Sequence, residues 1–277
     1  MALHEFAPSL VLTDYIRSYR LVRFEFKSGL ALPCKAYPPR PEHCLSFYPK
    51  DFEQVEFAGS GKKVGNLRAV LFGQQTEVSN RFVGSDFLLF QVVLKPGLLL
   101  MIRVVLSLES MNCYLDAEIV FSSEIKNVNE KLNDCSGHEE MVAVVEAFLS
   151  NEIRKKSLSP NRIDTINTTL FTRNFLPTVD KLADEACLST RQCERLFKER
   201  MGVSPKYFLK VLRFENTFRM KNKHPHLDWL TLALHCGYYD YQHLAKDYRD
   251  LTQKTPNDFY RMELAAPERA FGAVDTY

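Results

Sequence analysis

Residues 179–208 read VDKLADEACLSTRQCERLFKERMGVSPKYF, and residues 229–260 follow the same plan about 50 residues later. The corresponding positions are Ala183 and Ala233, Leu188 and Tyr238, Phe197 and Tyr248, and Ser204-Pro205 and Thr255-Pro256. The second copy holds one extra residue, because the offset between the copies grows from 50 to 51 midway. A repeat of this kind indicates two copies of one supersecondary unit.

Each copy has the features of two short helices joined by a tight turn. A small residue in the first helix, Ala183 or Ala233, allows the two helices to cross closely. Ser189 and Asp240 stand where each can cap the second helix by accepting a backbone N–H. The sequence therefore predicts two helix-turn-helix units.

The second helix of each copy has one inward and one outward face. The inward residues are Cys193, Leu196 and Phe197, which share their face with Arg200, and in the second copy Leu244 and Tyr248. The outward residues are Arg191, Gln192, Glu194, Arg195 and Lys198, and in the second copy Tyr241, Gln242, His243, Ala245 and Lys246. Arginine pairs with guanine, glutamine with adenine and lysine with phosphate. We therefore predict that both outward faces contact duplex DNA.

A long helix between the copies sets their spacing. Ser204-Pro205 is an N-cap followed by proline at the first helical position, which is a strong helix start. A helix from Pro205 to about Met220 would be about 24 Å long. Recognition helices in successive major-groove segments lie about 34 Å apart. This helix, together with the widths of the units, is compatible with that spacing.

Residues 161–262 resemble the DNA-binding domain of the AraC/XylS family of transcription regulators. The matching residues are Leu182-Ala183, Ser189, Arg191-Gln192, Glu194-Arg195, Phe197-Lys198, Gly202, Ser204-Pro205, Leu212-Arg213, Cys236-Gly237-Tyr238, His243-Leu244, Tyr248-Arg249, Thr255-Pro256 and Phe259-Tyr260-Arg261. The resemblance covers a little over a third of the chain and includes both copies. It implies a seven-helix domain in a regulator that binds double-stranded DNA, with RNA polymerase as a partner if the protein is an activator.

The resemblance also implies which residues face the bases. They are Arg191, Glu194 and Arg195 in the first unit and Tyr241, Gln242, Ala245 and Lys246 in the second. Three positions depart from the family pattern. Cys187 replaces a turn glycine, at a cost of about 1 kcal/mol if its backbone is left-handed, and Cys193 replaces a large apolar residue. Ala245 offers no hydrogen bond, so the second unit is expected to rely more on phosphate contacts.

The N-terminal half has the pattern of a β-rich domain. Short apolar or alternating runs at residues 21–26, 44–48, 69–72 and 87–94 are separated by proline and glycine, as in an antiparallel sandwich or barrel. Family members often carry an N-terminal cupin-like barrel that binds an effector or mediates dimerisation.

We therefore expect a two-domain α+β protein. An effector-binding and dimerisation domain occupies residues 1–155, β-rich over 1–121 and helical over 122–155, and an all-α DNA-binding domain occupies residues 156–277, with its core at 161–262. Residues 138–153 form an amphipathic helix whose stripe of Met141, Val144, Val145, Phe148 and Leu149 packs on its own domain or on a second subunit. The charged stretch from Ile153 to Pro160 is the expected linker.

An aromatic-rich stretch from Tyr37 to Tyr48 is a candidate effector site. Its proposed ligand-binding residues are Tyr37, Arg40, Glu42, His43 and Phe47. The alternative is an ordinary loop that enters a core strand. We expect a small-molecule effector to bind the N-terminal domain and to modulate DNA binding.

The charge distribution favours a polyanion partner for the second half. Residues 151–262 hold 20 Lys and Arg against 13 Asp and Glu, whereas residues 1–150 hold 15 against 18. The sequence has no nucleophile-elbow, phosphate-loop or zinc-protease motif, so we predict no enzyme and no cofactor. His224 and His226 lack a third metal ligand nearby and are expected to lie in a surface turn.

The seven cysteines form no C-x-x-C pair, which favours a reducing compartment. An alternative function is a thiol-based redox sensor, in which Arg191 and a helix N-terminus lower the pKa of Cys187 or Cys193; the competing interpretation is that both are small packing residues. No apolar run approaches the roughly 20 residues that span a bilayer, and the N-terminus has no signal-peptide pattern. We expect a cytoplasmic homodimer that does not bind membranes.

Overall fold

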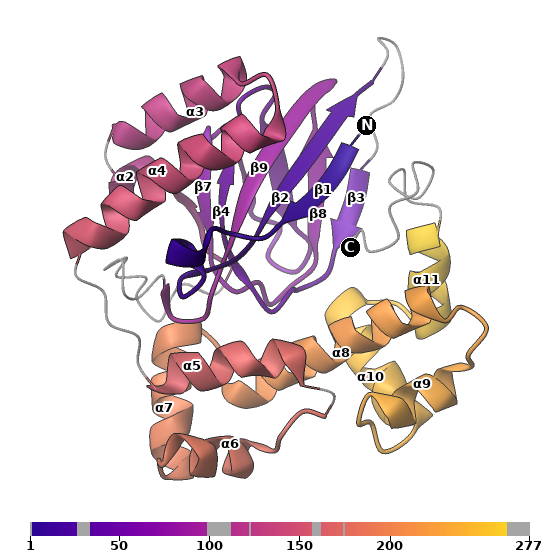
Figure 1. The fold of residues 1–277 in the computed structure, drawn as a ribbon. Coiled ribbons are helices and arrows are strands. Elements are labelled where there is room, and N and C mark those ends of the chain that lie inside the picture. The colour runs from indigo at the N-terminus through magenta and orange to yellow at the C-terminus, as the bar shows by residue number, and fades with distance from the viewer. Residues whose placement is uncertain are drawn as a thin grey trace.

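The computed structural model describes residues 2–26, 34–98, 112–121, 123–156, 162–173 and 175–264. Its first half contains two antiparallel sheets followed by helices, and its second half is all α-helix (Figure 1). This confirms the predicted fold class at the level of a β-rich part followed by an all-α part. No helix in the described ranges is long and apolar enough to cross a membrane.

The larger sheet has six strands in the order β1-β2-β9-β4-β7-β10. They are β1 (Ala2–Phe6), β2 (Ile16–Glu25), β9 (Asp86–Leu94), β4 (His43–Phe47), β7 (Ala69–Phe72) and β10 (Tyr114–Asp116). The smaller sheet has the order β3-β8-β5-β6, formed by β3 (Cys34–Tyr37), β8 (Ser79–Val83), β5 (Glu53–Phe57) and β6 (Lys63–Gly65). The four runs predicted as strands lie on β2, β9, β4 and β7, which are the inner strands of the larger sheet.

Side chains alternate between the two faces of the larger sheet, as the pleat requires. Cys44 on β4 joins an apolar cluster that also contacts Val83 of the smaller sheet. The next residue, Leu45, joins a cluster with Val145 and Phe148 of the helical layer. That layer consists of α2 (Glu118–Phe121), α3 (Glu124–Asp134) and α4 (His138–Lys156). Figure 1 shows α3 and α4 lying along one side of the larger sheet.

The apolar stripe of α4 packs on its own domain. Met141, Val145, Phe148 and Leu149 are buried in the same cluster as the sheet residues, and Val144 is partly buried against it. The stripe therefore does not require a second subunit. The predicted start of the linker is wrong, because α4 continues through Ile153 to Lys156, and Ile153 packs against this cluster.

The second half contains seven α-helices and one short 3-10 helix within residues 162–264. They are α5 (Arg162–Thr169), η2 (Leu170–Thr172), α6 (Val179–Ala186), α7 (Thr190–Met201), α8 (Pro205–Lys223), α9 (Trp229–His235), α10 (Tyr241–Thr252) and α11 (Pro256–Leu264). The pair α6 and α7 is called unit one here, and the pair α9 and α10 is called unit two.

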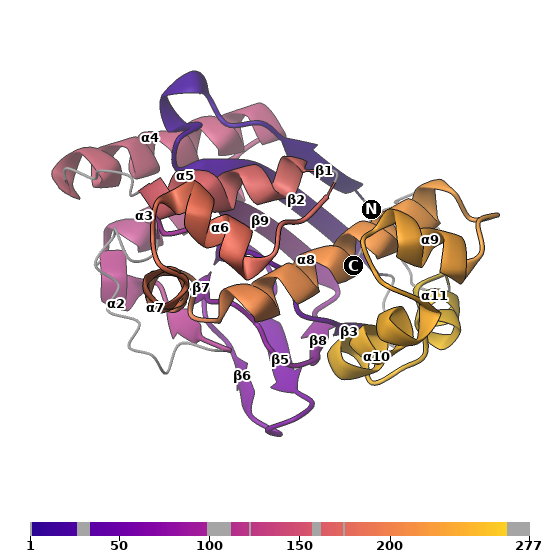
Figure 2. The same ribbon diagram turned by 90° about the horizontal axis from the view of Figure 1, so that it is seen from below.

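Helix α8 connects the two units. It contributes Phe208 and Leu212 to the core of unit one, and Phe214 and Phe218 to the core of unit two. Its 19 residues correspond to a length of about 28 Å at the usual helical rise. Units one and two lie at opposite ends of α8 (Figures 1 and 2). The predicted spacing helix is therefore confirmed, and it is one turn longer than expected.

Candidate nucleic-acid interface

Both predicted helix caps are present. The Ser189 side chain accepts a hydrogen bond from the Gln192 backbone N–H at 3.3 Å, and the Gln192 side chain accepts one from the Ser189 backbone N–H at 3.0 Å. In unit two, the Asp240 carboxylate accepts a hydrogen bond from the His243 backbone N–H at 2.7 Å. These caps fix where α7 and α10 begin, and therefore which side chains lie at their first turns.

The turn of unit one has a left-handed residue that is not glycine. Cys187 has φ 55° and ψ 45°, and its backbone N–H bonds back to carbonyl oxygens of α6. At the corresponding turn of unit two, Gly237 has φ 79°. The condition stated for Cys187, a left-handed backbone, is met, and unit one carries a strained turn that unit two avoids.

On α7, the predicted outward residues are exposed and the predicted core is inside. Arg191, Gln192, Glu194, Arg195 and Lys198 are all exposed, whereas Cys193 and Phe197 are fully buried. The Gln192 side-chain oxygen is occupied by the cap. Arg195 lies 3.7 Å from Glu199, an exposed pair one turn apart that contributes little to stability.

On α10, one predicted outward residue is buried. Gln242, His243 and Lys246 are exposed and Tyr241 is half-buried, but Ala245 is only 1% exposed. The prediction that Ala245 faces outward is wrong. It lies four residues after Tyr241 and one after Leu244, so it falls within the helical stripe that continues to Tyr248.

A network of ion pairs that the sequence did not reveal fastens α10 to α8. Asp247 is 5% exposed, and its carboxylate lies 3.5 Å from the Arg213 guanidinium and 3.7 Å from Lys210 Nζ. Lys210 Nζ also bonds Asp250 at 2.6 Å. The sequence signal for this network was Asp247 itself, a charged residue beside the apolar stripe of α10. Its partners could not be predicted because they lie on α8.

Helix α7 is fastened differently. Arg200, which the sequence placed on the inward face, forms a two-point ion pair with Asp164 of α5, and both side chains are nearly buried. Asp164 in turn lies against the backbone of Gly97, where an added Cβ would stand 2.1 Å from the carboxylate oxygen. Because Gly97 belongs to the turn after β9, α5 connects α7 to the N-terminal half.

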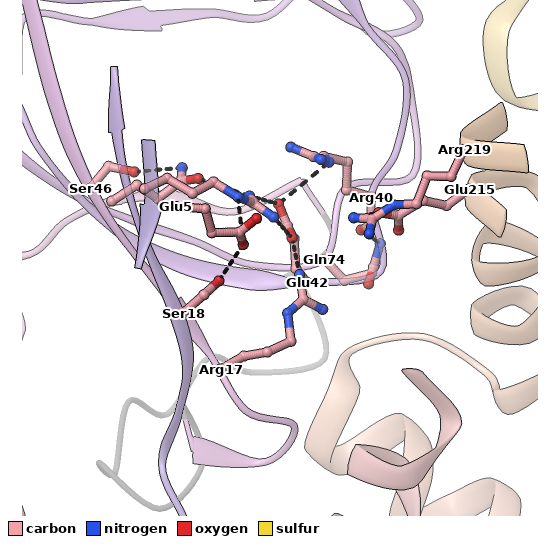
Figure 3. A network of polar contacts seen from close by, with 11 residues as sticks. Glu5, Arg17, Ser18, Arg40, Glu42, Ser46, Gln74, Glu215 and Arg219 are labelled. Carbon is pink, nitrogen blue, oxygen red and sulfur yellow. Dashed lines mark hydrogen bonds and ion pairs between the residues drawn. The ribbon is translucent and has the colours of Figure 1, made fainter. Parts of the chain in front are cut away.

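Three of the five predicted effector residues cluster around one buried carboxylate. Glu42 accepts hydrogen bonds from Arg17 at 2.5 Å and from Arg20 at 2.6 and 2.9 Å, and Arg40 lies 3.6 Å away (Figure 3). Burial disfavours the charged form of Glu42, but the guanidiniums of Arg20, Arg40 and Arg17 outweigh it and hold its pKa well below its usual range. His43 is also buried. Glu42 therefore already has protein partners.

The other two predicted effector residues lie elsewhere. Tyr37 is half-buried and its ring lies 4.9 Å below the guanidinium of Arg81. Phe47 is fully buried in the cluster between the larger sheet and the helices. The five residues therefore occupy three separate environments, and the β4 residues among them are core residues of the larger sheet.

The thiol hypothesis is not supported by the environment of Cys193. Burial raises the pKa of this thiol above its usual value, and Glu194 adds to the effect. This is opposite to the expected direction, because the helix buries the side chain among Phe197 and Leu182 rather than presenting it to Arg191. Cys193 is a packing residue, and Cys187 is exposed in the turn.

Comparison with known proteins finds a family match within the second half of the chain. Residues 182–262 match the model of a family described as a helix-turn-helix domain. A comparison with curated protein sequences found no match.

Three solved structures illustrate the similarity. ToxT from Vibrio cholerae has 10% sequence identity over 89% of this chain and 99% of its own, with a TM-score of 0.49. A regulator from Chromobacterium violaceum with an AraC-type DNA-binding domain has 28% identity over 38% of this chain and 94% of its own, with a TM-score of 0.33. The DNA-binding domain of AdpA, solved with a target DNA, has 19% identity over 40% of this chain and 99% of its own, with a TM-score of 0.35. Residues 182–262, which lie within the segment that resembles the AraC/XylS DNA-binding domain, are a helix-turn-helix domain.

Proposed function

We propose that this protein is a sequence-specific regulator of transcription that places α7 and α10 in successive major-groove segments of duplex DNA. The observation that carries the proposal is that each unit presents a capped helix with an exposed polar face, at opposite ends of one rigid helix. Two recognition helices enter successive major-groove segments when they lie about 34 Å apart, which is one turn of DNA. We call α7 and α10 the recognition helices from here on.

Their exposed side chains divide into two roles. Arg191 and Arg195 suit guanine edges and Gln242 suits adenine, whereas Lys198 and Lys246 suit phosphates. Glu194, Tyr241 and His243 complete the proposed contact surface. Gln192 is proposed to act mainly through the cap of α7, because its carbonyl oxygen already accepts from Ser189.

Selection from a pool of duplexes with a randomised window of about 25 base pairs, somewhat more than two helical turns, tests the proposal. The full-length protein should enrich two blocks of preferred bases about one turn apart. Arg195→Ala should lose about 1 to 3 kcal/mol of binding free energy and relax one position, whereas Lys198→Ala should weaken all sequences alike. Lys63→Ala, which removes a lysine that is 74% exposed on the N-terminal half, is the control. Equal, sequence-independent losses from Arg195→Ala and Lys198→Ala would contradict the assigned roles.

We further propose that residues 1–155 form the regulatory and dimerisation domain and that residues 156–277 form the DNA-binding domain. The apolar clusters support this division, since residues up to Ile153 share two cores and residues from Ile163 share two others. A small molecule that binds the first domain would act through the contacts between the halves. Sedimentation of the full-length protein tests the dimer, and a single monomer at tens of micromolar would contradict it.

A further inference from the structure

The N-terminal half makes a direct hydrogen bond to the end of the first recognition helix. His43 Nε2 lies 3.3 Å from the backbone carbonyl of Met201, the last residue of α7. A carbonyl only accepts, so the proton must be on Nε2. Burial lowers the pKa of His43 to about 4, which keeps the ring neutral near pH 7 with this one N–H to donate. His43 therefore satisfies a carbonyl that α7 itself leaves open.

Other contacts between the halves also fall on unit one and on α8. The Tyr207 hydroxyl, on the first turn of α8, donates to the Thr76 carbonyl at 3.2 Å. The Arg17 guanidinium lies 4.4 Å above the ring of Phe171, which packs against the core of unit one. Figure 3 shows Arg40 and Gln74 facing Glu215 and Arg219 of α8.

Glu42, the residue before His43, is held by a cluster of arginines. Glu42 is clamped by Arg17 and Arg20, and Arg20 also bonds Gln91 of the adjacent strand β9 at 3.1 Å. Arg17 belongs to this clamp and to the Phe171 contact at once. Arg17 therefore links the Glu42 carboxylate to unit one, and His43, the next residue in the chain, contacts the end of α7.

The second recognition helix has a different support. Asp247 and Asp250 fasten α10 to Lys210 and Arg213 of α8, and Leu244 and Tyr248 pack on the α8 side chains of the second core. These contacts lie wholly inside the C-terminal half. The two recognition helices are thus held by unlike partners.

We propose that Glu42 and His43 are positioning residues through which the N-terminal half sets the first recognition helix, while α10 reads its bases independently of them. This rests on the proposed function, since it assigns regulation to one of the two DNA-contact units. A signal received by the N-terminal half would then alter base preference in one block of the binding site and leave the other block intact.

Selection from the same duplex pool with full-length variants tests this proposal. His43→Leu removes the donor and keeps an apolar side chain of similar bulk. It should weaken discrimination about fivefold or more in the block read by α7, a usual size for coupling between sites, and change the α10 block less than twofold. His43→Gln, which can still donate to Met201, should restore most of the loss. Asp247→Asn, which weakens the support of α10, should show the reverse pattern.

Glu42→Gln, which weakens the ion pairs with Arg17 and Arg20, carries the same expectation if His43→Leu does not fold. Equal losses in both blocks, no loss in either, or no rescue by His43→Gln would overturn the proposal. Failure of the wild-type protein to enrich any sequence would instead refute the proposed function. The two failures are therefore distinguishable in one experiment.

Discussion

Replacing Cys187 by glycine is expected to stabilise the C-terminal half. Cys187 has φ 55°, and a residue with a Cβ in this region is disfavoured by about 1 to 2 kcal/mol. Glycine removes this strain, but about 0.5 to 1 kcal/mol of the stabilisation is offset because glycine has more conformational freedom in the unfolded chain. The Cys187 side chain is exposed, so its loss removes little packing. The net expectation is a gain of about 0.5 to 1 kcal/mol in the free energy of unfolding.

The equivalent turn of unit two supplies the matched control. Gly237 has φ 79°, and a Cβ added there would meet nothing within 4 Å, so Gly237→Ala should destabilise through the backbone alone, by about 1 kcal/mol. Urea unfolding followed by circular dichroism measures both variants, and the single tryptophan, Trp229, reports on the core of unit two. Destabilisation by Cys187→Gly, or no effect of Gly237→Ala, would refute the strain argument.

Further predictions concern buried charges. The pKa of His43 is about 4 in the folded protein and about 6.5 when unfolded. The stability that neutral His43 contributes is therefore fully present above pH 6.5 and is lost as the pH falls towards 4, by about 3 kcal/mol in all. Urea unfolding from pH 7 to 4.5 should show a steeper decline for wild type than for His43→Gln; parallel curves would contradict the assignment. Asp164→Asn should cost about 3 kcal/mol, because it leaves Arg200 nearly buried without its carboxylate. The double variant with Arg200→Met should recover part of that loss in the same assay, and a purely additive loss would argue against the pair.

Local features of the C-terminal half could be predicted from the sequence because they depend on neighbouring residues. The caps at Ser189 and Asp240 follow from side-chain type and position alone, whereas the left-handed turn at Cys187 was indicated only by the glycine that the family carries at this position. Ala245 shows where the reasoning failed. Both the division of α10 into two faces and the family resemblance placed it outward, but it follows Leu244 directly and lies four residues after Tyr241, and the structure buries it.

Contacts between distant parts of the chain could not be predicted. His43 and Met201 are 158 residues apart, and nothing local to either residue indicates the other. Glu42 was chosen as a ligand-binding residue because it is a charged group in an aromatic stretch, but three arginines from β2 and the loop before β4 surround it. Strand pairing had to bring β2 beside β9, and β9 beside β4, before this cluster existed.

Methylation interference on a selected duplex tests whether α7 and α10 bind successive major-groove segments together. Methylation of guanine N7 blocks contacts in the major groove only, where both recognition helices are proposed to bind. We expect two blocks of interference on one face of the duplex, with centres about 10 to 11 base pairs apart. Arg195→Ala should remove interference at one guanine of one block and leave the other block unchanged. A single block, or two blocks on opposite faces of the duplex, would contradict the joint use of α7 and α10.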